Sequence, residues 1–398
     1  MQQLGLLHKL LEKELPSIHK IRLKNLLDSV SALLKSNKLT LTSLGRHLPG
    51  RSTVRSNIRK QDRILGNHHL QTERKAFYET MTSFLLQHNT MPWIHIDWSC
   101  ICSLTKCYLI RASLSMSGRS IVLYEECHSK SGENNHKVHK SFLNNLKSVL
   151  PETAKPVIVT DAGFRAPWFT YVREIGWDFV GRLRNKNLIF LKETSSWELS
   201  GSLYKLARHK PQYLGSALLT RAAKVSVELV RFKERAKNRH KLTKYNELSA
   251  SGRSKRYAKA QNEPWILVTS LPQSKDLARQ TVNIYKQRMR IEENFRDTKC
   301  TRYGFGLKDS RTKSTERMNI LLLIAAIATF ACWIAGIHAK NRGKDKDYQA
   351  HSAKFSSLSF VYLGREVLKK NMRIRKKQFY ECIQEVAKVS TLTQMEGA

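Results

Sequence analysis

The hydrophobic pattern changes its period near residue 91, and this change constrains what the chain can fold into. Before it, apolar residues recur every three or four positions, as in Leu6, Leu7 and Leu10, which predicts helices. After it, short apolar segments bounded by turn residues predict strands. These strand-like segments lie at 91–97, 107–116, 119–127, 155–161 and 177–183. Helical patterns at 138–149 and 165–174 lie among them.

Three antiparallel strands in a row, followed by alternating strands and helices, predict an α/β sheet of the ribonuclease-H type. Residues 185–276 break the alternation with short β-like stretches around a strongly basic segment, which predicts an inserted β subdomain with a basic loop. The expected organisation has five parts. These are a helical region at 1–90, the first part of the core at 91–184, the insertion at 185–276, the second part of the core at 277–339, and C-terminal helices at 340–398.

The chain is strongly basic. Its 398 residues include 70 lysines and arginines against 32 aspartates and glutamates, a formal net charge of +38. Such an excess repels itself unless a polyanion neutralises it, so nucleic acid is the first candidate partner and an anionic membrane surface the second. Solubility alone requires far less charge.

Residues 39–65 resemble a helix-turn-helix. A short helix from Thr42 is expected to meet a turn at Pro49-Gly50, and a second helix to begin near Ser52 as its N-cap. The second helix is basic and suits a DNA groove, with Arg55 and Arg59 as the expected contacts. The alternative is a plain pair of helices with a solvated basic face.

The segment 318–337 is almost entirely apolar and is long enough, at about 20 residues, to cross a bilayer. It is the single run of this kind, and dense charge flanks both of its ends, so a buried core helix is preferred and no membrane partner is expected. The seven cysteines form no C-x-x-C pair and predict free thiols in a reducing cytosol. The N-terminal residues show no signal-peptide pattern, and a cytoplasmic location is expected.

Two aspartates occupy similar places in the predicted sheet. Asp97 and Asp161 are each the first acid after an apolar strand, at its expected carboxyl end, where α/β sheets gather ligands. Two carboxylates at one sheet edge repel each other unless a cation neutralises them, and Mg²⁺ or Mn²⁺ suits such oxygen ligands. The alternative is that each aspartate caps the turn that follows it.

A helix predicted over 277–299 carries a polar line beside its apolar stripe. On a helical wheel of about 100° per residue, the line spans roughly 80°. Its members are Tyr285, Arg288, Glu292, Arg296 and Lys299. A carboxylate flanked by cations and a phenol suits a site that binds both metal and phosphate. The alternative is a solvated helix face with ion pairs between successive turns.

The spacing Tyr285-x2-Arg288-x3-Glu292-x6-Lys299 resembles the Y-R-E-K signature of bacterial cut-and-paste insertion-sequence transposases of the DDE type. The segments around Asp97 (IDWS) and Asp161 (TDAGFRAPW), and GLKDSRT at 306–312, are also similar to that family. The resemblance covers nearly the whole chain. It implies a ribonuclease-H-like catalytic core with a β insertion, and a homodimeric synaptic complex on two transposon ends, in the cytoplasm among nucleoid DNA.

The resemblance also implies a mechanism. Asp97, Asp161 and Glu292 would be the catalytic acids and would hold two Mg²⁺ ions, with Mn²⁺ as a substitute. Tyr285, Arg288 and Lys299 would contact phosphates of double-stranded DNA. The freed 3′-OH would form a hairpin, be released again and join target DNA.

Hairpin formation is eased by a flipped base. Trp265, Met289 and Trp98 are the candidates to stack on that base or to wedge into its place. Core packing is the alternative for each of the three.

Two other functions compete with this one. A structure-specific, metal-dependent endonuclease would use the same core without strand transfer, and an inactive transposase-derived repressor would only bind DNA. The long insertion argues against the first alternative, and the three retained acids argue against the second.

Overall fold

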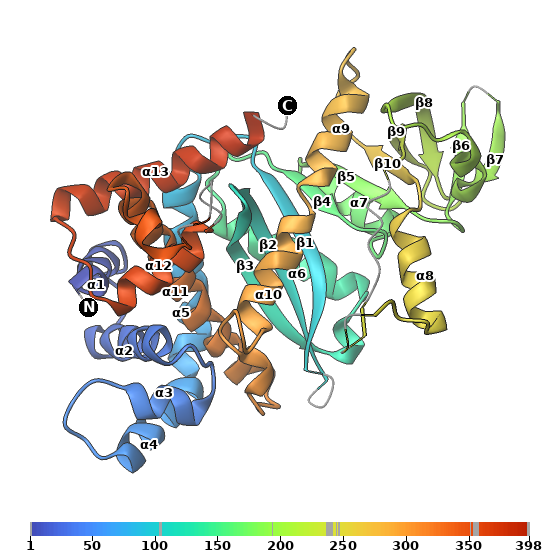
Figure 1. Cartoon of the computed structure of the whole chain (residues 1–398). Helices are drawn as coiled ribbons and strands as arrows, with labels where there is room; N and C mark the ends of the chain where they lie inside the picture. Colours follow the sequence, from blue (N-terminus) through green and yellow to red (C-terminus); the bar gives the residue numbers. More distant parts are fainter. Residues whose placement is uncertain are drawn as a thin grey trace. The chain divides into compact units, whose positions relative to one another are not determined.

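The computed structural model describes residues 2–102, 106–192, 194–235, 242–243, 245, 247–350, 352 and 358–395 (Figure 1). The chain divides into two units. The first unit consists of Met1–Lys155 and Arg288–Glu396, and the second contains Pro156–Gln287. Residues 236–241, 244 and 246 of the predicted basic loop lie outside the described residues.

The first unit begins with five helices, as the leucine spacing predicts. They are α1 (Gln2–Glu14), α2 (Lys20–Ser36), α3 (Leu41–His47), α4 (Val54–Leu65) and α5 (His68–Leu85). Helices α3 and α4 lie where the sequence predicts two helices joined by a turn, and they contact closely because Gly45 leaves room for Ile58. The predicted N-cap is wrong by one residue. Thr53, not Ser52, accepts the hydrogen bond from the Ser56 N–H that caps α4.

Three antiparallel strands follow in the order β3-β2-β1, as predicted. They are β1 (Trp93–Cys102), β2 (Cys107–Met116) and β3 (Arg119–Ser129), with Gly118 at φ +70° in the hairpin turn between β2 and β3. The predicted end of β1 at Asp97 is wrong. The strand runs on to Cys102, and Asp97 pairs in mid-strand with Arg111 of β2. A carboxylate is tolerated in mid-strand because that of Asp97 pairs with Arg288 rather than facing an apolar layer.

Further helices complete the first unit, and most of them pack against these strands. They are α6 (His136–Val149), α10 (Met289–Lys299), α11 (Thr315–Asn341), α12 (Phe360–Lys369) and α13 (Lys376–Met395). Among the described residues, α11 alone is long and apolar enough to cross a membrane, and 94% of its most apolar window is buried inside the protein. The prediction of a core helix at 318–337 is therefore confirmed. Gly336 and Gly364 let α11 and α12 touch, since a Cβ at either would collide with a backbone carbonyl.

The second unit is built on a mixed sheet in the order β4-β5-β10-β9-β8-β6-β7. Its elements are β4 (Val157–Thr160), α7 (Ala166–Glu174), β5 (Asp178–Leu183), β6 (Leu188–Leu191), β7 (Ser196–Leu199), β8 (Gln212–Leu219), β9 (Val225–Phe232), α8 (Gly252–Gln261), β10 (Trp265–Thr269) and α9 (Leu277–Lys286). Strands β4 and β5 pair in parallel, and β10 joins β5 and β9 antiparallel. The described elements also include four short 3-10 helices. One lies in the second unit, at Ser200–Leu206, and three lie in the first unit, at Lys130–Gly132, Leu307–Asp309 and Lys344–Tyr348.

The single helix predicted over 277–299 is wrong, because it is interrupted at Gln287 and Arg288. Helix α9 ends at Lys286 and α10 begins at Met289. Tighter bonds replace the helical pattern there, from Gln287 N–H to Ile284 O and from Ile291 N–H to Arg288 O. Tyr285 and Arg288 therefore belong to two separate helices rather than to one continuous helical face.

Candidate active site

One guanidinium joins two of the predicted acids in the first unit. Arg288 donates from Nη1 to Asp97 Oδ2 at 3.1 Å and from Nη2 to Glu292 Oε1 at 2.8 Å. The side chains of Arg288 and Asp97 are 13% and 15% exposed, whereas that of Glu292 is 47% exposed. The fold thus brings together an acid from β1 and an acid from α10 that lie 195 positions apart in the sequence.

Arg288 stands at the N-cap of α10, where the helix dipole disfavours a cation. Asp97 and Glu292 offset this cost, and Glu292 in the first turn also interacts favourably with the dipole. The second oxygen of Asp97, Oδ1, accepts from the backbone N–H of Trp98 at 2.8 Å. The carboxylate of Asp97 is therefore held in one orientation.

Lys299, at the other end of α10, also reaches β1. Its ammonium donates to Ser99 Oγ at 2.6 Å and to the Cys100 carbonyl at 3.3 Å. Burial, followed by the nearby Lys308 and Arg111, lowers the pKa of Lys299. Because Ser99 is two residues from Asp97, both side chains lie on the same face of the strand. The cations at both ends of α10 therefore meet one face of β1.

A buried ion pair lies beneath α10. Arg111 of β2 binds Glu125 of β3 at 2.6 Å, and both side chains are almost fully buried. Arg111 also donates to the side chains of Asn294 and Thr298, one turn apart on α10. Asn294 in turn donates to the Ser120 carbonyl at 2.9 Å. These bonds fix the rotation of α10 about its axis, and with it the direction of Glu292.

Sequence reasoning missed this support, although a signal was present. Arg111 and Glu125 are charged residues inside two otherwise apolar strands. A hairpin turn at Ser117-Gly118 brings them close to the same register, and in the structure they are direct partners. Charges that face each other in a buried sheet are expected to pair.

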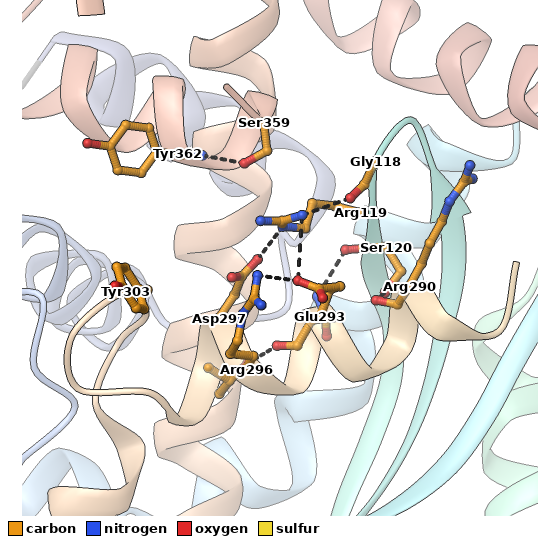
Figure 2. A network of polar contacts seen from close by, with 12 residues as sticks. Gly118, Arg119, Ser120, Arg290, Glu293, Arg296, Asp297, Tyr303, Ser359 and Tyr362 are labelled. Carbon is orange, nitrogen blue, oxygen red and sulfur yellow. Dashed lines mark hydrogen bonds and ion pairs between the residues drawn. The ribbon is translucent and has the colours of Figure 1, made fainter. Parts of the chain in front are cut away.

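A second set of charges occupies another side of α10 (Figure 2). Arg119, at the start of β3, binds Asp297 at 2.9 Å and lies 3.7 Å from Glu293, which also pairs with Arg296. Burial raises the pKa of Asp297 in spite of the neighbouring Arg119. Ser120 Oγ donates to the Arg290 carbonyl at 3.2 Å. These contacts tie α10 to the β2–β3 hairpin, and Arg296 belongs to them rather than to the group around Arg288.

Trp98 is held by a histidine. Its indole N–H donates to His139 Nε2 at 2.9 Å, so this imidazole nitrogen is unprotonated. Burial, with His136 and His128 nearby, lowers the pKa of His139 to about 4. Trp98 is half-buried, and its ring also meets His128. The indole of Trp98, the residue that follows Asp97, therefore packs against the two imidazole rings of His139 and His128.

The remaining predicted residues of the first unit are on its surface. Met289 is 48% exposed, and its sulfur lies 3.8 Å from Arg288 Nη2. Arg55 and Arg59 are exposed on α4, four residues apart on one side of the helix. All three side chains are accessible to a large partner.

The other predicted residues lie in the second unit. Asp161 directly follows β4, as predicted, and its Oδ1 accepts from the Gly163 N–H at 2.8 Å, as the capping alternative expects. The ring of Tyr285 is buried against Trp265, with centroids 5.0 Å apart and an edge-to-face geometry. Trp265 also packs on Phe232 at 5.5 Å. The ring of Trp265 therefore has partners on two elements, α9 and β9.

The acids around Arg288 suit a cation. Within the described part of the chain, no group of three histidine, cysteine, aspartate or glutamate side chains is arranged to hold a metal ion. Asp97 and Glu292 nevertheless converge on one positive group, and their oxygens are the ligand type that Mg²⁺ and Mn²⁺ prefer. The donor set of the first unit fits a divalent ion.

Comparison with known families adds an independent observation. The transposase DDE domain matches residues 105–329, more than half of the chain. The chain belongs to the transposase DDE domain family. The matched segment includes Asp161 and Glu292 and starts after Asp97. No curated protein matches the sequence at a significant level. The prediction of a DDE-type transposase is confirmed, and enzymes of this family generally use divalent metal ions.

Proposed function

We propose that this transposase is a cut-and-paste enzyme of the Y-R-E-K type. It binds the ends of its own element, nicks them by metal-dependent hydrolysis, forms a hairpin by transesterification, and joins the freed 3′-OH ends to target DNA. The observation that carries this proposal is the convergence of Asp97 and Glu292 on Arg288, in a chain whose residues 105–329 match the transposase DDE domain. A ribonuclease-H-like core at 91–184 and 277–339, interrupted by an insertion at 185–276, belongs to the same proposal.

Asp97, Asp161 and Glu292 would hold the divalent ions, Mg²⁺ or Mn²⁺. Such ions, when bound, make a water nucleophilic and stabilise the leaving oxygen. The β1 ladder and the Trp98 N–H keep the Asp97 carboxylate in a fixed direction. Glu292 is half exposed and accessible to DNA. Asp161 is assigned by its place after β4 and by the family resemblance.

The basic residues would position the DNA. The Lys299 ammonium, which donates to Ser99 and to the Cys100 carbonyl, is partly desolvated and would be a good partner for a phosphate near the scissile bond. Arg55 and Arg59 on α4 would contact the transposon end, and the +38 charge would neutralise further phosphates. Helices in 340–398 would add dimer or DNA contacts in a homodimeric synaptic complex. Such a protein acts in the cytoplasm on nucleoid DNA.

A flipped base would need an accessible partner. Met289 has the most open position of the three candidates, being half exposed and in contact with Arg288. Trp98 is engaged by His139, and Trp265 is engaged by Tyr285 and Phe232, so each would have to stack through the part of its ring that stays exposed.

The test is cleavage of a labelled duplex that carries the element's terminal repeat, with Mg²⁺, resolved on a denaturing gel. Wild-type protein should give a nick and then a hairpin. Asp97→Asn, Asp161→Asn and Glu292→Gln should each abolish the nick while keeping end binding in metal-free buffer. Nicking without later joining to target DNA would favour the endonuclease, and end binding without any nick would favour the repressor.

A further inference from the structure

Arg288 is placed where a metal-dependent enzyme would hold its cation. A single guanidinium, only 13% exposed, donates one N–H group to each of the two acids, at 3.1 Å and 2.8 Å. A guanidinium always carries its charge. It therefore neutralises part of the charge of Asp97 and Glu292 permanently, and it does so through the oxygens that would ligate a metal.

The guanidinium and a divalent ion compete for these oxygens. Mg²⁺ requires ligand oxygens at about 2.0–2.1 Å in near-octahedral geometry. An ion at that distance from Asp97 Oδ2 and Glu292 Oε1 would lie close to Arg288, and the two positive groups would repel each other at short range. The ion can bind tightly only when the guanidinium has another anion to bind.

We propose that Arg288 is an internal counter-ion that weakens metal binding at Asp97 and Glu292 until a DNA phosphate draws the guanidinium away. The inference rests on the proposed function, since it assumes that these two acids are metal ligands. Arginine and phosphate form short, frequently bidentate hydrogen bonds, so a backbone phosphate is a fitting alternative anion. Metal loading is then coupled to DNA binding, and the bare protein is kept from cutting.

The first experiment measures Mn²⁺ binding to the full-length protein without DNA, from the electron paramagnetic resonance signal of free Mn²⁺. Arg288→Gln removes the charge and keeps a polar, although shorter, side chain. It should bind Mn²⁺ at least about tenfold more tightly than wild type. Arg288→Lys should stay near wild type, because it keeps the positive charge.

The matched control is Arg296→Gln on the same helix. Arg296 pairs with Glu293 rather than with Asp97 or Glu292, so its loss should leave Mn²⁺ affinity within about twofold of wild type. Adding Asp97→Asn to Arg288→Gln should abolish the gain, which places the extra ion at Asp97. Thermal melting of each variant shows whether it is folded.

The second experiment repeats the Mn²⁺ titration with an end duplex present. The Asp97→Asn/Glu292→Gln protein with the same duplex provides the background from ions on the DNA. The duplex should raise the site affinity of wild type towards that of Arg288→Gln and change Arg288→Gln little. By thermodynamic reciprocity, Mn²⁺ should strengthen wild-type DNA binding by the same factor.

Two results would overturn the proposal. One is a folded Arg288→Gln protein with unchanged Mn²⁺ affinity, and the other is a gain in affinity that persists without Asp97. Failure of the proposed function looks different. In that case Arg288→Gln still tightens Mn²⁺ binding at Asp97, but wild-type protein neither binds nor cuts the end duplex.

Discussion

Helix α10 carries acids on two sides, and the fold uses them differently. On one side, Glu292 shares Arg288 with Asp97 of β1 and remains half exposed. On another side, Glu293 and Asp297 meet Arg119 and tie the helix to the β2–β3 hairpin (Figure 2). Adjacent residues of the same charge thus acquire different roles. The role of each acid depends on the cation that it binds. Arg288 also binds Asp97, a second predicted catalytic acid, whereas Arg119 belongs to the β2–β3 hairpin.

The largest expected effect is on the rate of end nicking, when Glu292 and its neighbour Glu293 are each replaced by Gln in separate variants. Glu292→Gln should lower the rate of end nicking by at least about 10³-fold, a loss of roughly 4 kcal/mol of transition-state stabilisation. Glu293→Gln should retain the rate within about threefold, because Glu293 only braces the helix. Single-turnover cleavage measures both variants. Equal losses in the two variants would erase the distinction between the two sides.

The next largest effect is expected on the stability of the protein, from breaking the buried ion pair between Arg111 and Glu125 beneath α10. Arg111→Met leaves the Glu125 carboxylate buried without its partner, and such a change costs about 3–5 kcal/mol of stability. Chemical denaturation should show this loss. Replacing both residues, as Arg111→Met/Glu125→Leu, should recover part of it. A single variant as stable as wild type would mean that the buried pair does not hold α10.

The hairpin side should tolerate change better. Arg119→Gln removes partly exposed ion pairs to Glu293 and Asp297, so the expected loss is about 1 kcal/mol or less. End nicking should stay within a few-fold of wild type. Denaturation and cleavage assays on one preparation check both statements. A loss of nicking comparable to that of Glu292→Gln would give Arg119 a role beyond bracing.

An effect that appears only at low pH concerns Trp98, next to Asp97 on β1. Burial lowers the pKa of His139 to about 4, whereas the unfolded chain binds its proton near the ordinary value of 6.5. The stability that depends on neutral His139 is therefore present above pH 6.5 and is lost as the pH falls from 6.5 towards 4.

Melting curves at pH 7 and pH 5 test this linkage. His139→Gln keeps an acceptor for the indole but does not titrate, so its melting temperature should fall less than that of wild type, by at least about 3 °C. The exposed His88, replaced by Gln, is the control and should behave like wild type, because His88 is not among the groups that shift the pKa of His139. Equal drops in wild type and His139→Gln would separate His139 from the pH response.

Sequence patterns located many elements and missed how some of them end. The alternation of apolar residues predicted β2 and β3, and the leucine spacing predicted the N-terminal helices. Asp97 was placed at a strand end because a polar residue after an apolar run reads as a boundary. In the structure, Asp97 lies opposite Arg111 on the neighbouring strand and forms an ion pair with Arg288. Both residues are too distant in the sequence for a local pattern to predict these contacts.

The helix break shows the same limit. Gln287 and Arg288 are good helix formers, so local propensity predicts a continuous helix from Leu277 to Lys299. The family spacing singled out Glu292 and Arg288, but it did not predict that they bind each other and Asp97. Which of the two adjacent acids, Glu292 or Glu293, faces Arg288 depends on the rotation of α10 about its axis. The hydrogen bonds from Arg111 to Asn294 and Thr298 fix that rotation.

We propose that Asp97 and Glu292 form the metal site together with Asp161. The most direct test is the anomalous scattering of Mn²⁺ in crystals of the protein with an end duplex. We expect anomalous peaks within coordination distance of all three carboxylates, with Arg288 turned to a phosphate. Peaks at Glu293 or Asp297 with none at Asp97 and Glu292, or a guanidinium still bridging Asp97 and Glu292 beside bound DNA, would contradict it.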